Sequence, residues 1–298
     1  MVAYSIKDLE NLSGVKAHTL RIWEKRYGII KPNRTETNIR FYMDCDLQKI
    51  LNITLLNRKG YKISKIAGMP NDEIRQKVAE LTEVGLVFED QLDALMLSMF
   101  ELDETKFNII LDHQISSKGF ENTMNDIVYP LLDKLSIMWI AGSVKGVHEN
   151  FVSNIIRRKT IVEIDKLNKT EGIQGFRCLI YLAENESHEL SLLFLQYILA
   201  KNGAKVINLG IGISLIDVLE GKNIFKAKYI FTIFNDSFSE TPLQPYLNEL
   251  ARNSQDSTII ISGFQTASQQ LDLPVNVKII NSIEHIKSFI YDEINTIN

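Results

Sequence analysis

Hydrophobic residues recur at helical spacing near the start of the chain. Leu20, Trp23 and Tyr27 stand at positions i, i+3 and i+7, so they share one face of a helix predicted over residues 19–28. The basic side chains of this segment lie off that face: Arg21, Lys25 and Arg26. One side of the helix can therefore pack on a core, with Trp23 in it, while the other side meets an anion such as phosphate.

The segment before this helix predicts a second, shorter helix and a turn. Ser5 and Asp8 have the spacing of a capping box, with Asp in the place of the usual Glu or Gln. Leu9 and Leu12 continue an apolar face, and Ser13-Gly14 ends the helix. A short helix, a glycine-containing turn and a basic second helix predict a helix-turn-helix.

Residues 29–42 predict a two-stranded hairpin. Pro32 and Asn33 mark a loop between short extended pieces, and Arg34 and Arg40 lie along it. The hairpin is either a wing that contacts nucleic acid or an ordinary polar surface loop. The adjoining basic helix favours the wing.

The middle of the chain predicts helices almost throughout. They are expected at residues 44–62, 72–84, 86–100, 103–117, 119–139 and 145–167, with a short helical turn at 61–66. Pro130 lies inside one of these helices and is expected to kink it. This much helix without strand patterns predicts a four-helix bundle.

From residue 176 onward, short apolar runs alternate with helices. Strands are expected at residues 176–183, 204–209, 229–234, 258–262 and 277–280, and helices at 188–201, 214–222, 241–253, 264–270 and 282–297. Five such units predict an α/β domain, a doubly wound five-stranded parallel sheet with helices on both faces. In these folds, ligands bind beyond the C-terminal ends of the strands.

Charge divides the chain between these regions. The whole chain carries 33 Lys and Arg against 37 Asp and Glu, whereas residues 1–65 alone carry 13 against 6. A basic head with a net charge of +7 therefore precedes a body with a net charge of -11. This division is expected where one domain meets nucleic acid.

Other features of the composition indicate the cell compartment. Cys45 and Cys178 stand far apart without a CxxC pair, so neither a disulfide framework nor a zinc finger is expected. The N-terminus enters a polar helix directly, and no run approaches the roughly 18 apolar residues of a membrane span. We therefore expect a cytoplasmic protein without a membrane partner.

Two polar groupings carry candidate chemistry. Glu186 and His188 follow the first predicted strand, and a carboxylate beside an imidazole can orient the ring so that its far nitrogen binds a metal. Trp139 and Glu149 flank a glycine-containing loop, where the plain interpretation is a helical hairpin with the Trp in the core and the Glu on the surface. His148 and Glu149 are expected to be two exposed residues rather than an acid–base pair.

The first seventy residues resemble the DNA-binding domain of MerR-type transcription regulators. The matching pattern is T-L-R-x-W-E-x-R-Y-G from Thr19, then P-x-R, then R-F-Y, then a helix from Asp44. The resemblance implies a recognition helix and a wing that bind double-stranded DNA. Their contacting residues would be Thr19, Arg21, Lys25, Arg26, Tyr27, Arg34 and Arg40.

The C-terminal third resembles cobalamin-binding domains, which carry D/E-x-H-x-x-G, S-x-L and G-G at the ends of strands one, three and four. The corresponding segments here are Glu186-Ser187-His188-Glu189-Leu190-Ser191, Thr232-Ile233-Phe234 and Ser262-Gly263. The resemblance implies that His188 is the lower axial ligand of cobalt and that the nucleotide tail of cobalamin enters the crevice. Ser191 and Ser262 replace glycines and narrow this slot without closing it.

The three parts in this order resemble the light- and cobalamin-responsive repressors of the CarH and LitR type, over essentially the whole chain. The resemblance implies that Trp139 and Glu149 cap the upper face of the corrin. Asn150 stands where the motif of that group has His, and Ile140 replaces a His that some members use to capture cobalt after photolysis. These departures concern the photochemical switch rather than cofactor binding in the dark.

Three functions remain open from the sequence. The first is a transcription regulator, a repressor, that binds a two-fold DNA operator as a dimer or tetramer and senses cobalamin. The second is the same regulator with a cofactor-free module that oligomerises or binds a regulatory protein. The third is a subunit of a cobalamin-dependent methyltransferase or mutase, which would leave the basic head unused. The expected domains are residues 1–72, 73–170 and 171–298.

Overall fold

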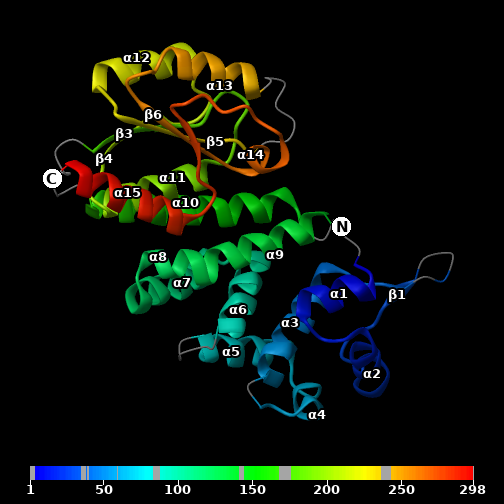
Figure 1. The fold of residues 1–298 in the computed structure, drawn as a ribbon. Helices are drawn as coiled ribbons and strands as arrows, with labels where there is room; N and C mark the ends of the chain where they lie inside the picture. Colours follow the sequence, from blue (N-terminus) through cyan, green and yellow to red (C-terminus); the bar gives the residue numbers. More distant parts are fainter. Residues whose placement is uncertain are drawn as a thin grey trace. The chain divides into compact units, whose positions relative to one another are not determined.

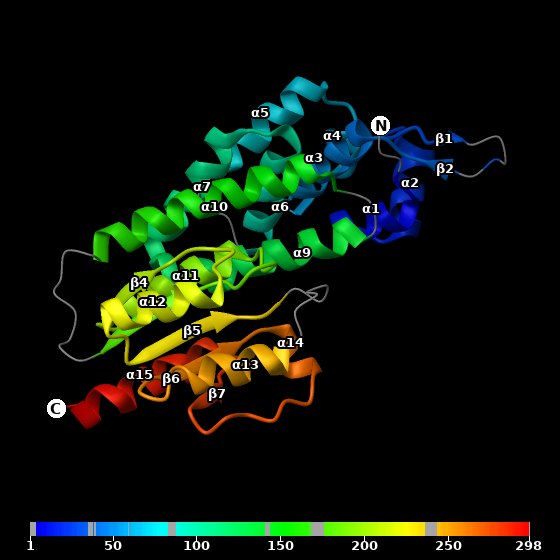
Figure 2. The same ribbon diagram turned by 90° about the horizontal axis from the view of Figure 1, so that it is seen from above.

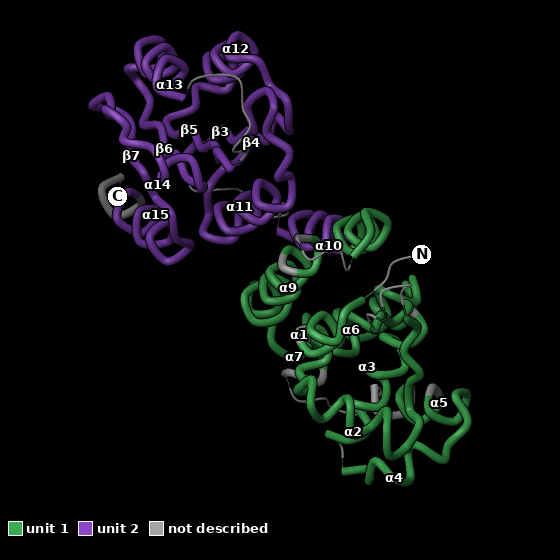
Figure 3. The backbone as a smooth tube through the Cα atoms, turned by 90° about the vertical axis from the view of Figure 1, so that its right-hand side faces the viewer, with its two compact units in different colours: residues 1–155 green, residues 156–298 purple. Residues whose placement is uncertain are grey.

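The structure is a computed structural model of the chain (Figure 1). It describes residues 4–34, 38, 40–58, 60–82, 88–140, 144–167, 176–235 and 243–297. The chain forms two compact units, Met1–Ile155 and Ile156–Asn298, and the division falls within one long helix (Figure 3).

The first unit begins with the predicted helix-turn-helix, which is confirmed. Helix α1 (Ile6–Ser13) starts at the expected capping box, because the Ser5 side chain accepts from the Asp8 N–H and the Asp8 carboxylate accepts from the Ser5 N–H. Gly14 ends α1 with a φ of 71°, in the left-handed region that suits glycine. Helix α2 (Ala17–Tyr27) follows after this short turn.

The predicted hairpin is also confirmed as a two-stranded antiparallel sheet. Strands β1 (Asn33–Arg34) and β2 (Arg40–Phe41) lie side by side in Figure 2. The loop between them includes residues 35–37 and 39, which lie outside the described residues. Backbone hydrogen bonds between Tyr4 and Tyr42, which are both buried, attach β2 to the start of the chain.

Helices make up the rest of the first unit. Helix α3 (Asp44–Arg58) ends four residues before its predicted end and is followed by the short α4 (Ile63–Ile66). Helix α5 (Asn71–Thr82) packs against α3, and so does α6 (Phe88–Glu101). Helix α6 also packs against α7 (Glu104–Lys118) and α9 (Tyr129–Ile140). Helix α10 (Gly146–Leu167) completes this predicted bundle, where its Phe151 ring meets Phe107 of α7 edge to face.

The helix predicted over residues 119–139 is not continuous. It consists of α8 (Phe120–Thr123), a π-helical turn η1 (Met124–Val128) and α9. Pro130 lacks an N–H, and its ring would collide with the carbonyl of Asp126 in a regular α-helix. The wider π turn just before the proline avoids this collision. The expected interruption is therefore present, but its main part precedes Pro130.

The second unit is the predicted α/β domain. Its strands are all parallel: β3 (Arg177–Tyr181), β4 (Lys205–Asn208), β5 (Tyr229–Ile233), β6 (Thr258–Ser262) and β7 (Val277–Ile279). Their order in the sheet is β4-β3-β5-β6-β7. The chain therefore moves from β3 outward to β4 and then back across to β5, so a switch point and its ligand crevice lie between β3 and β5.

Helices cover both faces of this sheet (Figure 1). One face packs against α12 (Leu215–Phe225) and α13 (Leu243–Arg252), with Leu179, Ile230 and Leu247 in the shared core. The other face packs against α11 (Glu189–Lys201) and α15 (Ile283–Ile297), and the short α14 (Phe264–Ser268) follows β6. Among the helices that the structure describes, none is long and apolar enough to cross a membrane.

Candidate functional site

Helix α2 presents the predicted basic face. Its apolar residues Leu20 and Trp23 are buried, as expected, while three cationic side chains are exposed: Arg21, Lys25 and Arg26. Arg26 places its guanidinium carbon 5.4 Å from the ring centre of the half-buried Tyr27. Thr19 is half-buried, with its hydroxyl 3.3 Å from a ring nitrogen of His18. The exposed face can meet phosphates without loss of the packing beneath it.

Glu24 connects this helix to the hairpin, a contact that the sequence reasoning missed. Its Oε1 lies 3.5 Å from Arg40 Nε on β2, and its Oε2 accepts a hydrogen bond from the Tyr42 hydroxyl at 3.3 Å. Burial and the nearby carboxylate raise the pKa of Tyr42 to about 12. The only sequence signal was that an acidic residue interrupts a basic helix.

The hairpin orders its other arginine by local contacts. Arg34 Nη1 donates to the side-chain oxygen of Asn38 at 2.6 Å and to its carbonyl at 3.3 Å. Asn38 has a φ of 65°, a backbone conformation that Asn tolerates better than most residues. Arg34 and Arg40 both stay exposed, so the hairpin adds two cations beside α2.

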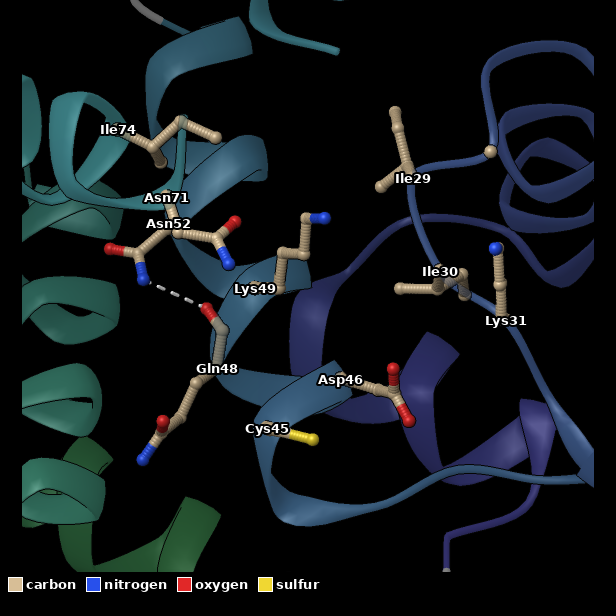
Figure 4. Close-up of a pocket in the computed structure, with 11 residues that line it drawn as sticks. Ile29, Ile30, Lys31, Cys45, Asp46, Gln48, Lys49, Asn52, Asn71 and Ile74 are labelled. Carbon is tan, nitrogen blue, oxygen red and sulfur yellow. Dashed lines mark hydrogen bonds between the residues drawn. The ribbon is translucent and has the colours of Figure 1, made fainter. Parts of the chain in front are cut away.

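A cavity of about 340 Å³ lies where the segment after α2 meets α3 and the start of α5 (Figure 4). Lys31 and Lys49 line it, together with Ile29, Ile30 and Asn52. The Asn52 amide donates to the Gln48 carbonyl at 3.0 Å. The basic surface of α2 therefore continues along the chain into a partly polar cavity.

Glu186 and His188 come together in the second unit, beyond the C-terminal end of β3. The Glu186 carboxylate is buried and accepts hydrogen bonds from the Asn235 N–H at 3.1 Å and the Gln265 amide at 3.4 Å. His188 immediately precedes α11 with 48% of its side chain exposed, and its Nδ1 lies 3.9 Å from Glu186 Oε2. The carboxylate is thus held by two other elements while the imidazole remains accessible. Sequence reasoning missed both Asn235 and Gln265.

The remaining crevice residues occupy the ends of three other elements. Ser191 lies half-buried in the first turn of α11, and Thr232 is buried in β5 opposite Tyr181. The Ser262 carbonyl accepts from the Phe234 N–H at 2.8 Å. Gly263 has a φ of 106°, and a Cβ there would lie 2.5 Å from the Phe234 carbonyl oxygen, so only glycine fits.

A cavity of about 180 Å³ opens at the C-terminal ends of β3 and β5, where the fold predicts a ligand. Ile213, Leu215 and Phe234 give it apolar walls, and Tyr246 adds a half-buried aromatic ring whose hydroxyl lies 2.8 Å from that of Tyr181. Three carboxylates also line it: Glu184, Glu186 and Glu249. These walls fit a flat, uncharged aromatic group, such as the base of a cobalamin nucleotide, better than they fit a phosphate.

The end of α9 and the start of α10 correct two expectations. Trp139 is 52% exposed rather than part of the core, and its ring lies over Gly146, where a Cβ would be 3.9 Å from Cη2. His148 is buried rather than exposed, because its Nδ1 accepts from the Lys145 N–H at 3.3 Å and its ring packs edge-on against Phe100. Glu149 is exposed, as expected.

Comparisons with known proteins agree with a separate DNA-binding domain at the N-terminus. Residues 4–75 match the MerR HTH family regulatory proteins. The chain is 24% identical over 213 residues to the HTH-type transcriptional repressor CarH of Myxococcus xanthus. This alignment covers 70% of each protein. It is 25% identical over 207 residues to the repressor CarA of the same organism, in an alignment that covers 69% of this chain and 67% of CarA.

A solved structure shares the fold of much of this chain. The monomethylamine corrinoid protein of Methanosarcina barkeri superposes with a TM-score of 0.54 at 11% identity, over 70% of this chain and 100% of that one. The chain therefore carries a MerR-type helix-turn-helix domain at its N-terminus and is homologous to the CarH repressor over 70% of its length.

Proposed function

We propose that this chain is a DNA-binding transcription regulator, a repressor, whose C-terminal module senses a cobalamin. The observation that carries the proposal is the exposed cationic face of α2 above the buried Leu20 and Trp23, beside a hairpin with two more arginines. The relatives CarH and CarA are transcriptional repressors by name, which supports the same activity here. Such a regulator works in the cytoplasm, where it meets its DNA.

In this proposal α2 enters the major groove and the hairpin follows the adjacent backbone. The DNA-contacting residues are Thr19, Arg21, Lys25, Arg26, Tyr27, Arg34 and Arg40. The acidic remainder of the chain repels DNA and confines contact to the head. A dimer or tetramer would present two such heads to a two-fold operator. The proposed domains are residues 1–72, 73–170 and 171–298.

The proposed sensor is the crevice of the α/β domain. His188 would bind the cobalt, and the anchored Glu186 would keep the imidazole in one orientation. Ser191, Thr232, Ser262 and Gly263 would line the slot for the nucleotide tail, and Trp139 and Glu149 would cover the corrin. A bound cobalamin would supply a metal centre whose ligand can be exchanged. An exposed Trp139 supports this role, because a structural Trp is normally buried.

Specific observations also favour the second candidate, a regulator with a cofactor-free module. Ser191 and Ser262 stand where cobalamin-binding domains have glycines, and three carboxylates line the cavity. A module of this kind would oligomerise or bind a regulatory protein. The third candidate, a methyltransferase-type subunit, leaves the basic α2 unexplained, and CarH and CarA are repressors rather than enzymes by name.

The DNA-binding half of the proposal is tested by selecting an operator from a random duplex pool with the wild-type protein. We expect Arg21→Ala and Arg26→Ala each to weaken operator binding by about tenfold and to lower the salt slope by about one. Arg252→Ala, an exposed residue of α13, removes the same charge and should have no effect. Failure of the wild type to select any sequence would refute this half.

The cofactor half is tested by mixing the protein with adenosyl-, methyl- or hydroxocobalamin, desalting it, and recording visible spectra in the dark and after illumination. We expect a retained red chromophore, lost in His188→Ala and kept in His285→Ala, a change at another exposed histidine. A colourless wild-type protein would support the cofactor-free candidate instead.

A further inference from the structure

Three charged side chains from three helices meet inside the first unit. Arg58 at the end of α3 places Nη1 2.5 Å from Oδ2 of Asp93 on α6. Lys134 of α9 approaches the other oxygen of the same carboxylate at 3.3 Å. Only 6% of the Asp93 side chain is exposed. A carboxylate buried to this degree is stable only with partners of opposite charge, so all three groups depend on one another.

The other terminal nitrogen of the Arg58 guanidinium contacts the helix-turn-helix. Its Nη2 donates to the carbonyl of Ser13, the last residue of α1, at 3.3 Å. The next residue is Gly14, and a Cβ there would lie 3.0 Å from the same Nη2. Arg58 therefore packs directly against the turn between α1 and α2 and satisfies a carbonyl at the helix end.

These contacts form a continuous series from α9 to the turn that orients α2. Lys134 binds Asp93, Asp93 binds Arg58, and Arg58 binds the Ser13 carbonyl. Lys134 lies on the same helix as Trp139, five residues earlier. Because a helix moves nearly as a rigid body, a displacement at the end of α9 that carries Trp139 reaches this series.

We propose that Asp93 is a positioning residue for the DNA-reading helix, and that it couples α9 to the turn before α2 through Lys134 and Arg58. The inference rests on the proposed function, since it assigns how the DNA-binding head is regulated. Two cations share one buried carboxylate, so a change at Lys134 alters how firmly Asp93 holds Arg58. The turn and the recognition helix then respond although no residue of α9 touches DNA.

The first test is hydrogen–deuterium exchange of the turn, which needs neither DNA nor cofactor. Its amides are protected by the hydrogen bonds of the Gly14 N–H to Glu10 O, at 2.9 Å, and of the Ala17 N–H to the Glu10 side chain, at 3.0 Å. We expect Asp93→Asn and Lys134→Met to raise exchange at residues 14–17. Asp133→Asn, an exposed neighbour on α9, and Lys118→Met on α7 are matched controls that should not.

The second test is binding to the selected operator. Asp93→Asn should weaken binding by about tenfold and Lys134→Met by about threefold. The salt slope should stay at the wild-type value, because no phosphate contact is removed. A residue that only stabilises the fold would lower the melting temperature and leave the affinity of the folded protein unchanged.

The outcomes separate this inference from the proposed function. A wild-type protein that binds no operator overturns the proposed function, while exchange at the turn still decides the coupling. Turn amides that exchange at the wild-type rate in both variants, or operator affinities equal to the wild type, overturn the inference. If Asp93→Asn does not fold, Lys134→Met decides it by the same two measurements.

Discussion

Glu24 lies on α2 with 18% of its side chain exposed, and both of its carboxylate oxygens face residues of the hairpin region. Arg40 keeps 42% of its side chain exposed while Glu24 holds its Nε, and among the described residues nothing binds the outer nitrogens of the guanidinium, which can therefore meet phosphate. One acidic residue thus sets the direction of an arginine on a different element. An acidic side chain in a DNA-binding face is explained by orientation rather than by contact with DNA.

We expect Glu24→Gln to weaken operator binding by about five- to tenfold, because the neutral amide holds Arg40 less firmly. Gel-shift titration of the selected operator measures the loss. In a double-mutant cycle, Arg40→Ala should cost much less in the Glu24→Gln background than in the wild type, since both changes remove one interaction. Glu73→Gln, on the exposed face of α5, is the matched control. Additive losses in the cycle would contradict this role.

Single residues also show what a sequence pattern can and cannot predict. Trp23 and Leu20 repeat with helical spacing, and burial follows from that spacing alone. Trp139 and His148 have no such pattern, and their exposure is the reverse of the expectation. Burial of His148 depends on Phe100, which is 48 residues earlier in the chain and on another helix. Glu186 and His188 were predictable as a pair, but the groups that hold Glu186 come from the segment after β5 and from α14, both distant in sequence.

Among the elements, locally encoded features were predicted well. The capping box of α1, the glycine after it, and the alternation of apolar runs with helices in the last third each depend on neighbouring residues only. The π turn η1 was missed, because its position depends on Pro130 together with the packing of the helix on both sides. The end of α3 was predicted to within four residues, because Gly60 marks it in the sequence.

The junction of β6 and α14 requires a glycine at residue 263. Gly263→Ala should destabilise the protein by roughly 3 kcal/mol or more, because the new Cβ would meet the Phe234 carbonyl in addition to the strain of a positive φ. Gly210→Ala is the matched control: its φ is 95°, but nothing lies within 4 Å of the Cβ position, so we expect about 1–2 kcal/mol from strain alone. Urea unfolding followed by circular dichroism measures both. Equal losses would show that the junction can relax.

At the scale of the whole molecule, the net positive charge and the ligand crevice lie in different parts of the chain. Residues 1–65 carry a net charge of +7, while the acidic body contains the crevice with its buried Glu186. A net charge of -4 hides this division, so a prediction from the average alone would miss the DNA-binding head. The division also explains how one chain can hold a polyanion through one domain and leave the other free to bind a different ligand.

Two tyrosines, one buried and one half-buried, make the stability of the two units depend on pH in alkaline solution. Burial raises the pKa of Tyr42 in the first unit and of Tyr246 in the second to about 12, above the value near 10 in an unfolded chain. A raised pKa favours the protonated form in the folded state. The stabilisation is therefore fully present below pH 10 and is lost as the pH rises through 12.

We accordingly expect the urea midpoint to be level between pH 8 and 9.5 and to fall steeply above pH 10. Tyr42→Phe should lower the midpoint slightly at pH 8, through loss of its hydrogen bond to Glu24, but should make the fall above pH 10 shallower. Tyr291→Phe, at a tyrosine that is 69% exposed, should leave the whole profile unchanged. The part of the tyrosinate absorbance near 295 nm that Tyr42→Phe removes should appear only together with unfolding. Its appearance at pH 10 in a fully folded protein would contradict the argument, because it would mean that the Tyr42 hydroxyl ionises without loss of the fold.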